Sequence, residues 1–192
     1  MAFLSFKPIT FIVSICLFLL ASTHCKAQDR IQAKLSIGAS LAYAPKITLG
    51  SSENSGIVSS VFGELEYGKL IGRLQYTSPL ISTFNEDNNL DGGSSYHGSL
   101  GYSFSLKENL KLAVMLSGGA AVVNYNNGIF GSSGDQFTNV SPQVGINVFP
   151  TYQISPLVSV QGGLRYYKGF EAGDRGRASD LFDLGIGLRL SL

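Results

Sequence analysis

Two side chains of the types found in hydrolases, His97 and Ser99, stand two residues apart in the stretch YHGSLGYSFSL. In an extended strand such a pair projects from one face, which places a general base beside a hydroxyl nucleophile. A serine hydrolase also needs an acid that orients the imidazole. The nearest acid downstream is Glu108, in a short turn at the far end of the same predicted strand. We therefore predict a packed histidine and no enzyme activity.

A second stretch, DNNLDGG, resembles the first half of a calcium-binding loop. Asp87, Asn89 and Asp91 would be the ligands, and Gly92 would supply the sharp turn. The twelfth position of such a loop should hold a bidentate glutamate, but here it is Gly98. We predict a flexible acidic loop with no bound metal, and weak divalent-cation binding is the alternative.

A third stretch, YYKGFEAGDRGRAS, mixes charges of both signs. Its bases are Lys168, Arg175 and Arg177, and its acids are Glu171 and Asp174. The bases would suit contacts with lipid-borne phosphates, while a solvated loop of mixed sign is the commoner role of such a stretch.

The first 27 residues have the features of a secretory signal peptide. Lys7 precedes an apolar run over residues 9–21, and small residues at Cys25 and Ala27 favour cleavage after Ala27. The run is short for a membrane-spanning helix, which needs about 20 residues. A retained anchor and a lipoprotein signal that ends at Cys25 are the alternatives. We predict a signal peptide over residues 1–27 and a single domain over residues 28–192.

Cleavage changes the charge and the chemistry of the chain. Losing Lys7 and Lys26 leaves twelve bases against thirteen acids, a net charge of −1, so no basic excess suggests nucleic acid. Both cysteines leave with the signal, and one histidine remains. A disulfide, thiol chemistry and a His-rich or Cys-rich metal cluster are therefore excluded, and we expect no cofactor.

The mature chain carries eight segments in which apolar residues recur at alternate positions. This alternation is typical of strands whose two faces meet different surroundings. Each segment is about ten residues long, as a tilted membrane strand needs to be. With no helical period, we predict an all-β fold, an eight-stranded antiparallel up-and-down transmembrane β-barrel. The segments lie at residues 31–43, 60–67, 70–78, 96–106, 110–122, 141–152, 158–166 and 181–192.

The connections between these segments alternate in length. Gly68 leads the first short turn, as a two-residue type II′ hairpin requires. Short turns at one rim and long polar loops at the other are typical of outer-membrane barrels, whose short turns are periplasmic. The short turns are 68–69, 107–109 and 153–157, and the long connections are 44–57, 79–95, 124–139 and 168–180.

Periodicity alone does not say which face of the sheet looks inward. A soluble lipocalin-like barrel would bury the apolar set, but the polar face here is rich in small residues and only 14% of the chain is charged. Aromatic residues on the apolar face gather near both strand ends, as at the two interfaces of a bilayer. We predict that the stripe from Phe182 to Leu192 faces lipid. The two girdles are Tyr43, Tyr76, Tyr96, Tyr166 and Phe182 at the long-loop end, and Tyr67, Tyr102, Phe104 and Tyr152 at the short-turn end.

Charged residues on the opposite face should pair inside the barrel, because buried charges need partners. Tyr67 faces Leu70 across the first turn, which places Glu64 opposite Arg73. Scattered surface ion pairs are the alternative. The predicted lumen charge network contains five bases and three acids: Lys34, Glu64, Glu66, Arg73, Lys111, Arg165, Asp183 and Arg189.

In these features the chain resembles the small eight-stranded outer-membrane barrels of Gram-negative bacteria, such as the transmembrane domain of outer-membrane protein A and outer-membrane protein X. The closing LFDLGIGLRLSL resembles the C-terminal signal that such chains present to the barrel-assembly machinery, although it ends in Leu192 where that family usually has Phe. The resemblance implies an outer-membrane location, with outer-membrane lipid and lipopolysaccharide as surroundings. We expect a monomer that binds no nucleic acid.

The resemblance also implies a structural or surface-interaction role, in which a rigid, plugged barrel presents four loops outside the cell. Three alternatives stay open. One is a narrow porin-like channel, gated by part of the charge network. Another is a lipid A-modifying enzyme, because His97 and Ser99 match the His-x-Ser pair of eight-stranded lipid A deacylases. The third is a soluble periplasmic lipocalin-like binder. In the channel alternative, the gate would consist of Glu64, Glu66, Arg73, Lys111 and Arg189.

Overall fold

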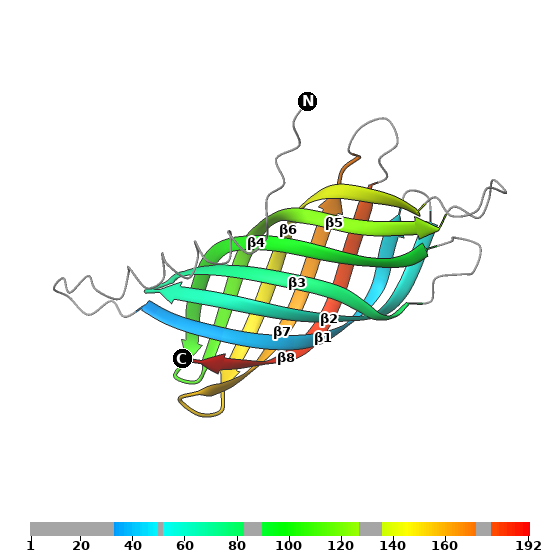
Figure 1. Cartoon of the computed structure of the whole chain (residues 1–192). Coiled ribbons are helices and arrows are strands. Elements are labelled where there is room, and N and C mark those ends of the chain that lie inside the picture. The colour runs from blue at the N-terminus through cyan, green and yellow to red at the C-terminus, as the bar shows by residue number, and fades with distance from the viewer. Residues whose placement is uncertain (1–32, 50–51, 83–89, 127–135, 172–177) are drawn as a thin grey trace. The chain divides into compact units, whose positions relative to one another are not determined.

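The computed structural model describes residues 33–49, 52–82, 90–126, 136–171 and 178–192. Its strands form one closed antiparallel barrel in chain order, with β8 paired to β1 (Figure 1), so the predicted fold class is confirmed. The predicted signal peptide, residues 1–27, lies outside the described residues. The strands are β1 Ala33–Leu49, β2 Ser52–Tyr67, β3 Leu70–Ser82, β4 Leu90–Lys107, β5 Leu110–Asn126, β6 Gln136–Gln153, β7 Val158–Gly169 and β8 Ser179–Ser191.

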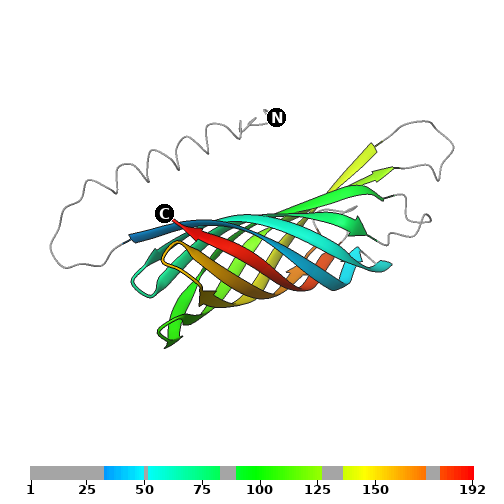
Figure 2. The same ribbon diagram turned by 90° about the horizontal axis from the view of Figure 1, so that it is seen from below.

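No helix within these described ranges is long and apolar enough to cross a membrane. Closure leaves the first and last strands side by side, as the view from below shows (Figure 2). The seam continues to the last residue, because Leu192 N donates to Leu35 O at 2.9 Å.

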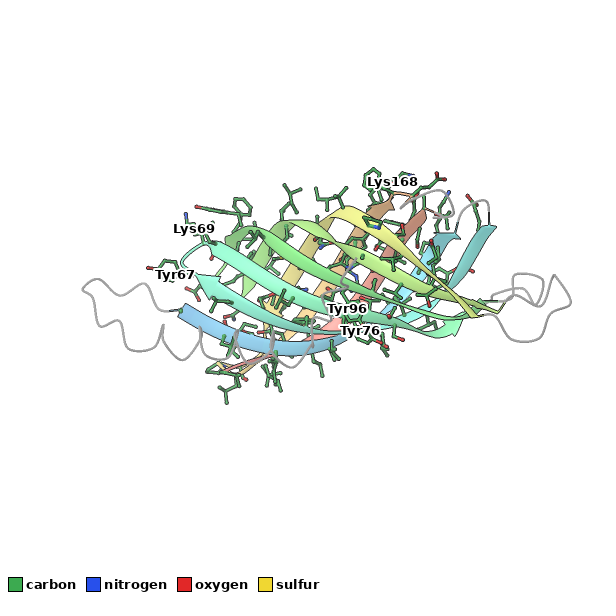
Figure 3. All side chains as sticks on the ribbon, turned by 45° about the horizontal axis from the view of Figure 1, so that its top comes forward. Tyr67, Lys69, Tyr76, Tyr96 and Lys168 are labelled. Atoms are coloured by element: carbon green, nitrogen blue, oxygen red, sulfur yellow. The ribbon has the colours of Figure 1, made fainter. Side chains whose placement is uncertain are left out.

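The two faces of the sheet have the predicted orientation. On β8 the large apolar residues point outward, and Ile186 is 64% exposed, whereas Asp183 is fully buried and Arg189 is 4% exposed. The same alternation runs round the barrel, and side chains stand out along its wall (Figure 3). An outward apolar surface can be stable only in a solvent that is itself apolar, since water would favour the opposite arrangement.

Large inward side chains fit because glycines lie opposite them on neighbouring strands. Gly38 pairs with Phe62, and a Cβ added at Gly38 would lie 2.4 Å from the Phe62 ring. Gly145 pairs with Tyr167, and a Cβ added there would lie 2.5 Å from that ring. An eight-stranded barrel has little interior volume, so bulk on one strand must be offset by its absence on the next.

The two rims differ as predicted, but the strands extend further than the alternation indicated. Gly68, in the turn between β2 and β3, has φ 62°, which fits a tight hairpin. At the other rim β1 and β2 continue to Leu49 and from Ser52, so the long connection predicted at 44–57 is mostly hairpin. The prediction was wrong there because backbone pairing above the apolar belt needs no apolar alternation.

A β-bulge changes which residues of β1 face outward. On β1, Ala44 pairs with Gly56 and Ile47 with Asn54, so β1 holds one extra residue in this interval. Up to Ala44 the even-numbered residues face inward, whereas beyond the bulge Ile47 is buried and Lys46 is exposed. Bulges re-aim side chains in this way. Pro142 and Pro150, by contrast, mark no bulge, since β6 keeps one register with β5 throughout.

Candidate functional site in the barrel lumen

The middle of the lumen is occupied by Arg73 and Glu64, which face each other on β3 and β2. Arg73 Nε donates to Glu64 Oε2 at 3.0 Å, and its Nη2 donates to the same oxygen. The guanidinium lies between two rings, 4.2 Å from the centroid of Phe62 and 3.8 Å from that of Phe149. Arg73 Nη2 also donates to Gln161 Oε1 at 2.7 Å. A charge held by a carboxylate, an amide and two aromatic faces is well compensated without water.

The network continues toward the short-turn end. Arg189 Nη2 lies 2.7 Å from Glu64 Oε1 and 3.4 Å from Glu66 Oε2. Lys111 Nζ donates to Glu66 Oε1 at 2.6 Å. Lys34 lies opposite Glu66 on the neighbouring strand. Ion pairs thus connect five of the eight predicted network residues, with Glu64 shared between two arginines, and Lys34 lies beside this group without an ion pair among the described residues.

The other two predicted residues form a separate pair nearer the long-loop end. Arg165 Nε donates to Asp183 Oδ1 at 2.6 Å, across β7 and β8. Arg165 Nη1 also donates to Ser60 Oγ at 2.8 Å, and Ser60 in turn lies 2.9 Å from Thr77 Oγ1. The wholly buried charges therefore balance within the lumen, while the two lysines lie toward its short-turn opening. The balanced set is Arg73, Arg165 and Arg189 against Glu64, Glu66 and Asp183.

The residues that could have formed a hydrolase site make other contacts. His97 Nε2 lies 2.9 Å from the Gln143 side-chain oxygen, and its ring stacks on Tyr167 at 3.8 Å. Ser99 Oγ is hydrogen-bonded to Ser117 Oγ at 2.7 Å. No hydrogen bond joins His97 to an acid among the described residues, so the arrangement lacks the acid that a triad requires.

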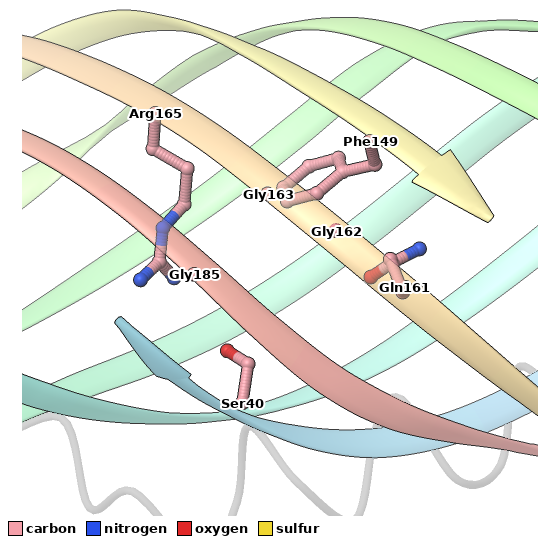
Figure 4. A pocket seen from close by; sticks show the side chains of 7 residues that line it. All are labelled: Ser40, Phe149, Gln161, Gly162, Gly163, Arg165 and Gly185. Atoms are coloured by element: carbon pink, nitrogen blue, oxygen red, sulfur yellow. The ribbon is translucent and has the colours of Figure 1, made fainter. Parts of the chain in front are cut away.

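A small cavity lies beside this network, between β7, β8 and β1 (Figure 4). It holds about 10 Å³, roughly the room that one water molecule needs. The Arg165 side chain reaches across Gly185 toward Ser40, and Phe149 and Gln161 border the same space (Figure 4). A void of this size is too small for a solute pathway.

Sequence reasoning missed three members of the site, Phe62, Phe149 and Gln161. Their signal was present, since all three fall at inward positions of the alternation. Their role depends on which strands meet across the lumen: Gln161 is on β7 and Arg73 on β3, 88 residues apart in the chain. The spacing of residues along one strand does not predict which side chains of two distant strands come into contact.

Charges also mark the long-loop edge of the outward apolar surface. Lys46 Nζ lies 2.7 Å from Glu53 Oε1, and Lys168 Nζ lies 2.7 Å from Asp180 Oδ2, with both lysine side chains about half exposed. The hydrogen bond to Glu53 raises the pKa of Lys46, and that to Asp180 raises the pKa of Lys168. Such outward charges belong beyond the hydrocarbon core, just above the girdle of tyrosines.

The tyrosines and lysines are distributed between the rims as Figure 3 shows. Tyr67 and Lys69 lie at the short-turn end and Lys168 at the other. Tyr76 and Tyr96 are adjacent, with ring centroids 5.1 Å apart. Of the residues predicted for the two girdles, these three tyrosines are exposed on the outward surface.

The weak candidate for a metal site, in the stretch DNNLDGG, lies outside the side chains that the structure describes. Asp87 and Asn89 lie outside the described residues, as do Arg175 and Arg177 of the basic loop, and the side chain of Asp91 is likewise not described. Among the residues that the structure describes, no three His, Cys, Asp or Glu side chains gather where they could hold a metal ion.

An eight-stranded closed barrel with an apolar exterior and a polar, packed interior is the fold of small outer-membrane proteins. Solved structures share this fold, among them the following two. Neisserial surface protein A matches with a TM-score of 0.66 and 19% identity, over 84% of this chain and 99% of that chain. A major outer membrane protein from Thermus thermophilus matches with a TM-score of 0.54 and 16% identity, over 84% of this chain and 100% of that chain.

The chain matches no family model, and no curated protein matches it in sequence. At the identities above, the two solved structures establish the fold alone. Both neighbours match this chain along nearly their whole length, which bears out the predicted small closed-barrel fold.

Proposed function

We propose that this protein is an integral outer-membrane barrel that is closed to solutes and acts through its outward-facing loops. The observation that carries the proposal is the seal at the level of Arg73, where the guanidinium is held by Glu64 and lies between the rings of Phe62 and Phe149. Removing any of these groups from its partners would leave a buried charge without compensation. The barrel is then a rigid support, and the long connections are its means of interaction.

The outward surface supports outer-membrane lipid and lipopolysaccharide as the surroundings of the barrel. The short turns would face the periplasm and the long connections the cell exterior. Lys46 and Lys168 would then lie at the height of lipopolysaccharide phosphates. Strand β8, which closes the barrel against β1, would be the segment that the barrel-assembly machinery recognises.

Fractionation and conductance together test this proposal. The protein should remain in the detergent-requiring membrane fraction and migrate differently on a gel when unboiled, because a folded barrel resists the detergent. In planar bilayers the wild-type barrel should give no steady openings. Release from membranes without detergent would support the soluble binder instead, and steady wild-type openings that change in Glu64→Ala would defeat the closed lumen.

A narrow channel is the second candidate, and one observation favours it. Glu64 contacts Arg73 through Oε2 and Arg189 through Oε1, so a modest shift of one carboxylate would strengthen one contact at the expense of the other. A gate needs two arrangements of similar energy. Wild-type openings whose frequency changes in variants of Glu64 or Arg189, and not in variants of the separate Arg165–Asp183 pair, would support this alternative.

We propose no enzymatic activity. His97 is 3% exposed and is hydrogen-bonded to an amide, so neither access nor an orienting acid supports hydrolysis. An enzyme that modifies lipid A would remove acyl chains in a manner that is lost in Ser99→Ala. We expect wild-type and Ser99→Ala membranes to show identical lipid A by mass spectrometry.

A further inference from the structure

The short-turn mouth of the lumen, defined here as Lys34, Glu66, Lys111 and Arg189, holds more cations than carboxylates. Lys111 Nζ donates to Glu66 Oε1 at 2.6 Å, and Arg189 Nη2 lies 3.4 Å from Oε2 of the same carboxylate. Lys34 lies opposite Glu66 and within electrostatic reach of both other cations. Three cations from three strands therefore surround one acid.

Both oxygens of that acid are already engaged. Within the part of the chain that the structure describes, no carboxylate lies within ion-pair distance of Lys34 Nζ. Arg189 is 4% exposed, yet its Nε has no hydrogen-bond partner among the described residues. The next carboxylate inward, Glu64, is already shared between Arg189 and Arg73. Positive charge and donor capacity thus exceed what the described residues compensate.

The short-turn mouth is open to water from its own end and closed from the other. The Lys111 side chain is 33% exposed and that of Glu66 is 9% exposed, whereas those of Arg73 and Glu64 are 1% and 0% exposed. The ring of Phe149 and that of Phe62 cover Arg73 immediately inward. An anion entering from the periplasmic side would therefore reach the surplus cations and stop at the aromatic seal.

We propose that the short-turn mouth is a binding site for a phosphate group, held by Lys34 and Arg189 with Lys111 at its entrance. A phosphate presents several strongly accepting oxygens in different directions, which suits an ammonium with three donors beside a guanidinium. Glu66 remains in the site and keeps Lys111 and Arg189 in place. The same chemistry is offered by inorganic phosphate and by the headgroup of an anionic phospholipid in the periplasmic leaflet.

The experiment uses the folded barrel in a non-ionic, phosphate-free detergent, with inorganic phosphate as the probe and chloride at equal ionic strength as the reference. Phosphate should raise the midpoint of thermal unfolding above that in chloride, and the phosphorus-31 NMR line of free phosphate should broaden. In Lys34→Gln the affinity should fall by about tenfold, the worth of one charge-assisted hydrogen bond. Without phosphate this variant should stay as stable as the wild type or become more stable, because it relieves repulsion from Lys111 and Arg189.

Lys69→Gln is the matched control, since Lys69 is an exposed lysine in the turn at the same rim. It should bind phosphate as the wild type does. Equal losses in Lys69→Gln and Lys34→Gln, or no stabilisation of the wild type by either inorganic phosphate or phosphatidylglycerol, would overturn the site. If only detergent doped with phosphatidylglycerol stabilises the wild type and not Lys34→Gln, the headgroup is the source of the phosphate. Failure here leaves the closed lumen intact as a proposal, because conductance depends on Arg73 and Glu64 deeper in the barrel.

Discussion

Glu64 and Arg73 face each other on neighbouring strands, joined by a hydrogen bond from Arg73 Nε to Glu64 Oε2 at 3.0 Å, with both side chains buried. Glu64→Gln would keep the shape of the side chain but leave Arg73 and Arg189 short of one negative charge. We expect it to lower the free energy of unfolding by about 3–5 kcal/mol, as breaking a buried ion pair does. Urea unfolding of the barrel in lipid vesicles, followed by circular dichroism, measures the loss.

Glu53→Gln is the control for that loss. Its ion pair with Lys46, at 2.7 Å, lies at the surface, with side chains 66% and 52% exposed. An exposed pair contributes about 0–1 kcal/mol. Similar losses in both variants would show that Glu64 is not held as a buried charge.

The packing of glycine against aromatic rings gives a second prediction. Gly38→Ala would place its Cβ 2.4 Å from Phe62 and equally close to the Leu188 carbonyl, so the ring must leave its place over Arg73. We expect a loss of about 1–3 kcal/mol in the free energy of unfolding, typical of an overpacked core. In the control Gly63→Ala the new Cβ meets nothing within 4 Å. The orientation of the sheet would be contradicted if Gly63→Ala were the more damaging of the two.

The outward belt gives a third prediction, because lipid penalises charge according to depth. Leu116 is 71% exposed in β5, beside Ile146 and Leu100 of the neighbouring strands. Leu116→Arg should cost about 2–4 kcal/mol in vesicles, as arginine does near the bilayer midplane. Leu157, which is 63% exposed in the last short turn, provides Leu157→Arg as the control, at about 0–1 kcal/mol near the interface. Equal, small costs would mean that this surface meets water.

The ion pairs at the long-loop rim predict a titration. The hydrogen bond from Lys46 to Glu53 raises the lysine pKa, so the charged form is stabilised in the folded protein. This stabilisation is complete below the ordinary lysine pKa and disappears as the pH rises through the raised value. NMR titration of the Lys46 side chain should give a pKa above that of an unpaired lysine. The pKa should return to the ordinary value in Glu53→Gln, and a wild-type pKa that is already ordinary would contradict the pair.

Much of the barrel architecture was predictable because alternate side chains of a strand face the same surroundings, so their polarity shows which face is apolar. Ile186 and Asp183 lie three positions apart on β8, so their opposite exposure follows from period two. The pairing of Glu64 with Arg73 followed from counting outward from the two-residue turn at Gly68. Both inferences need only local geometry.

The contacts across the lumen were not predictable in this way. Arg189 on β8 reaches Glu64 on β2, although β1 lies between these strands. That contact depends on the stagger with which the barrel closes, which no single hairpin specifies. The Phe149 ring, on β6, meets Arg73, on β3, for the same reason, although β4 and β5 lie between these strands. Residue types indicated what the interior could hold, whereas closure decided which groups met.

The extra residue at the β1 bulge changes which side chains of that strand face outward. Before the bulge, the odd-numbered side chains of β1 face outward toward hydrocarbon. After it, the even-numbered Lys46 faces outward and the odd-numbered Ile47 faces inward. If β1 ran through Pro45 without a bulge, regular alternation would turn Lys46 toward the interior beside Val58 and Leu181 and would turn Ile47 outward. Deleting Pro45 would instead remove the bulge and leave Lys46 outward and Ile47 inward. On this side of the barrel, one extra residue in β1 therefore lies where the outward surface changes from apolar to charged.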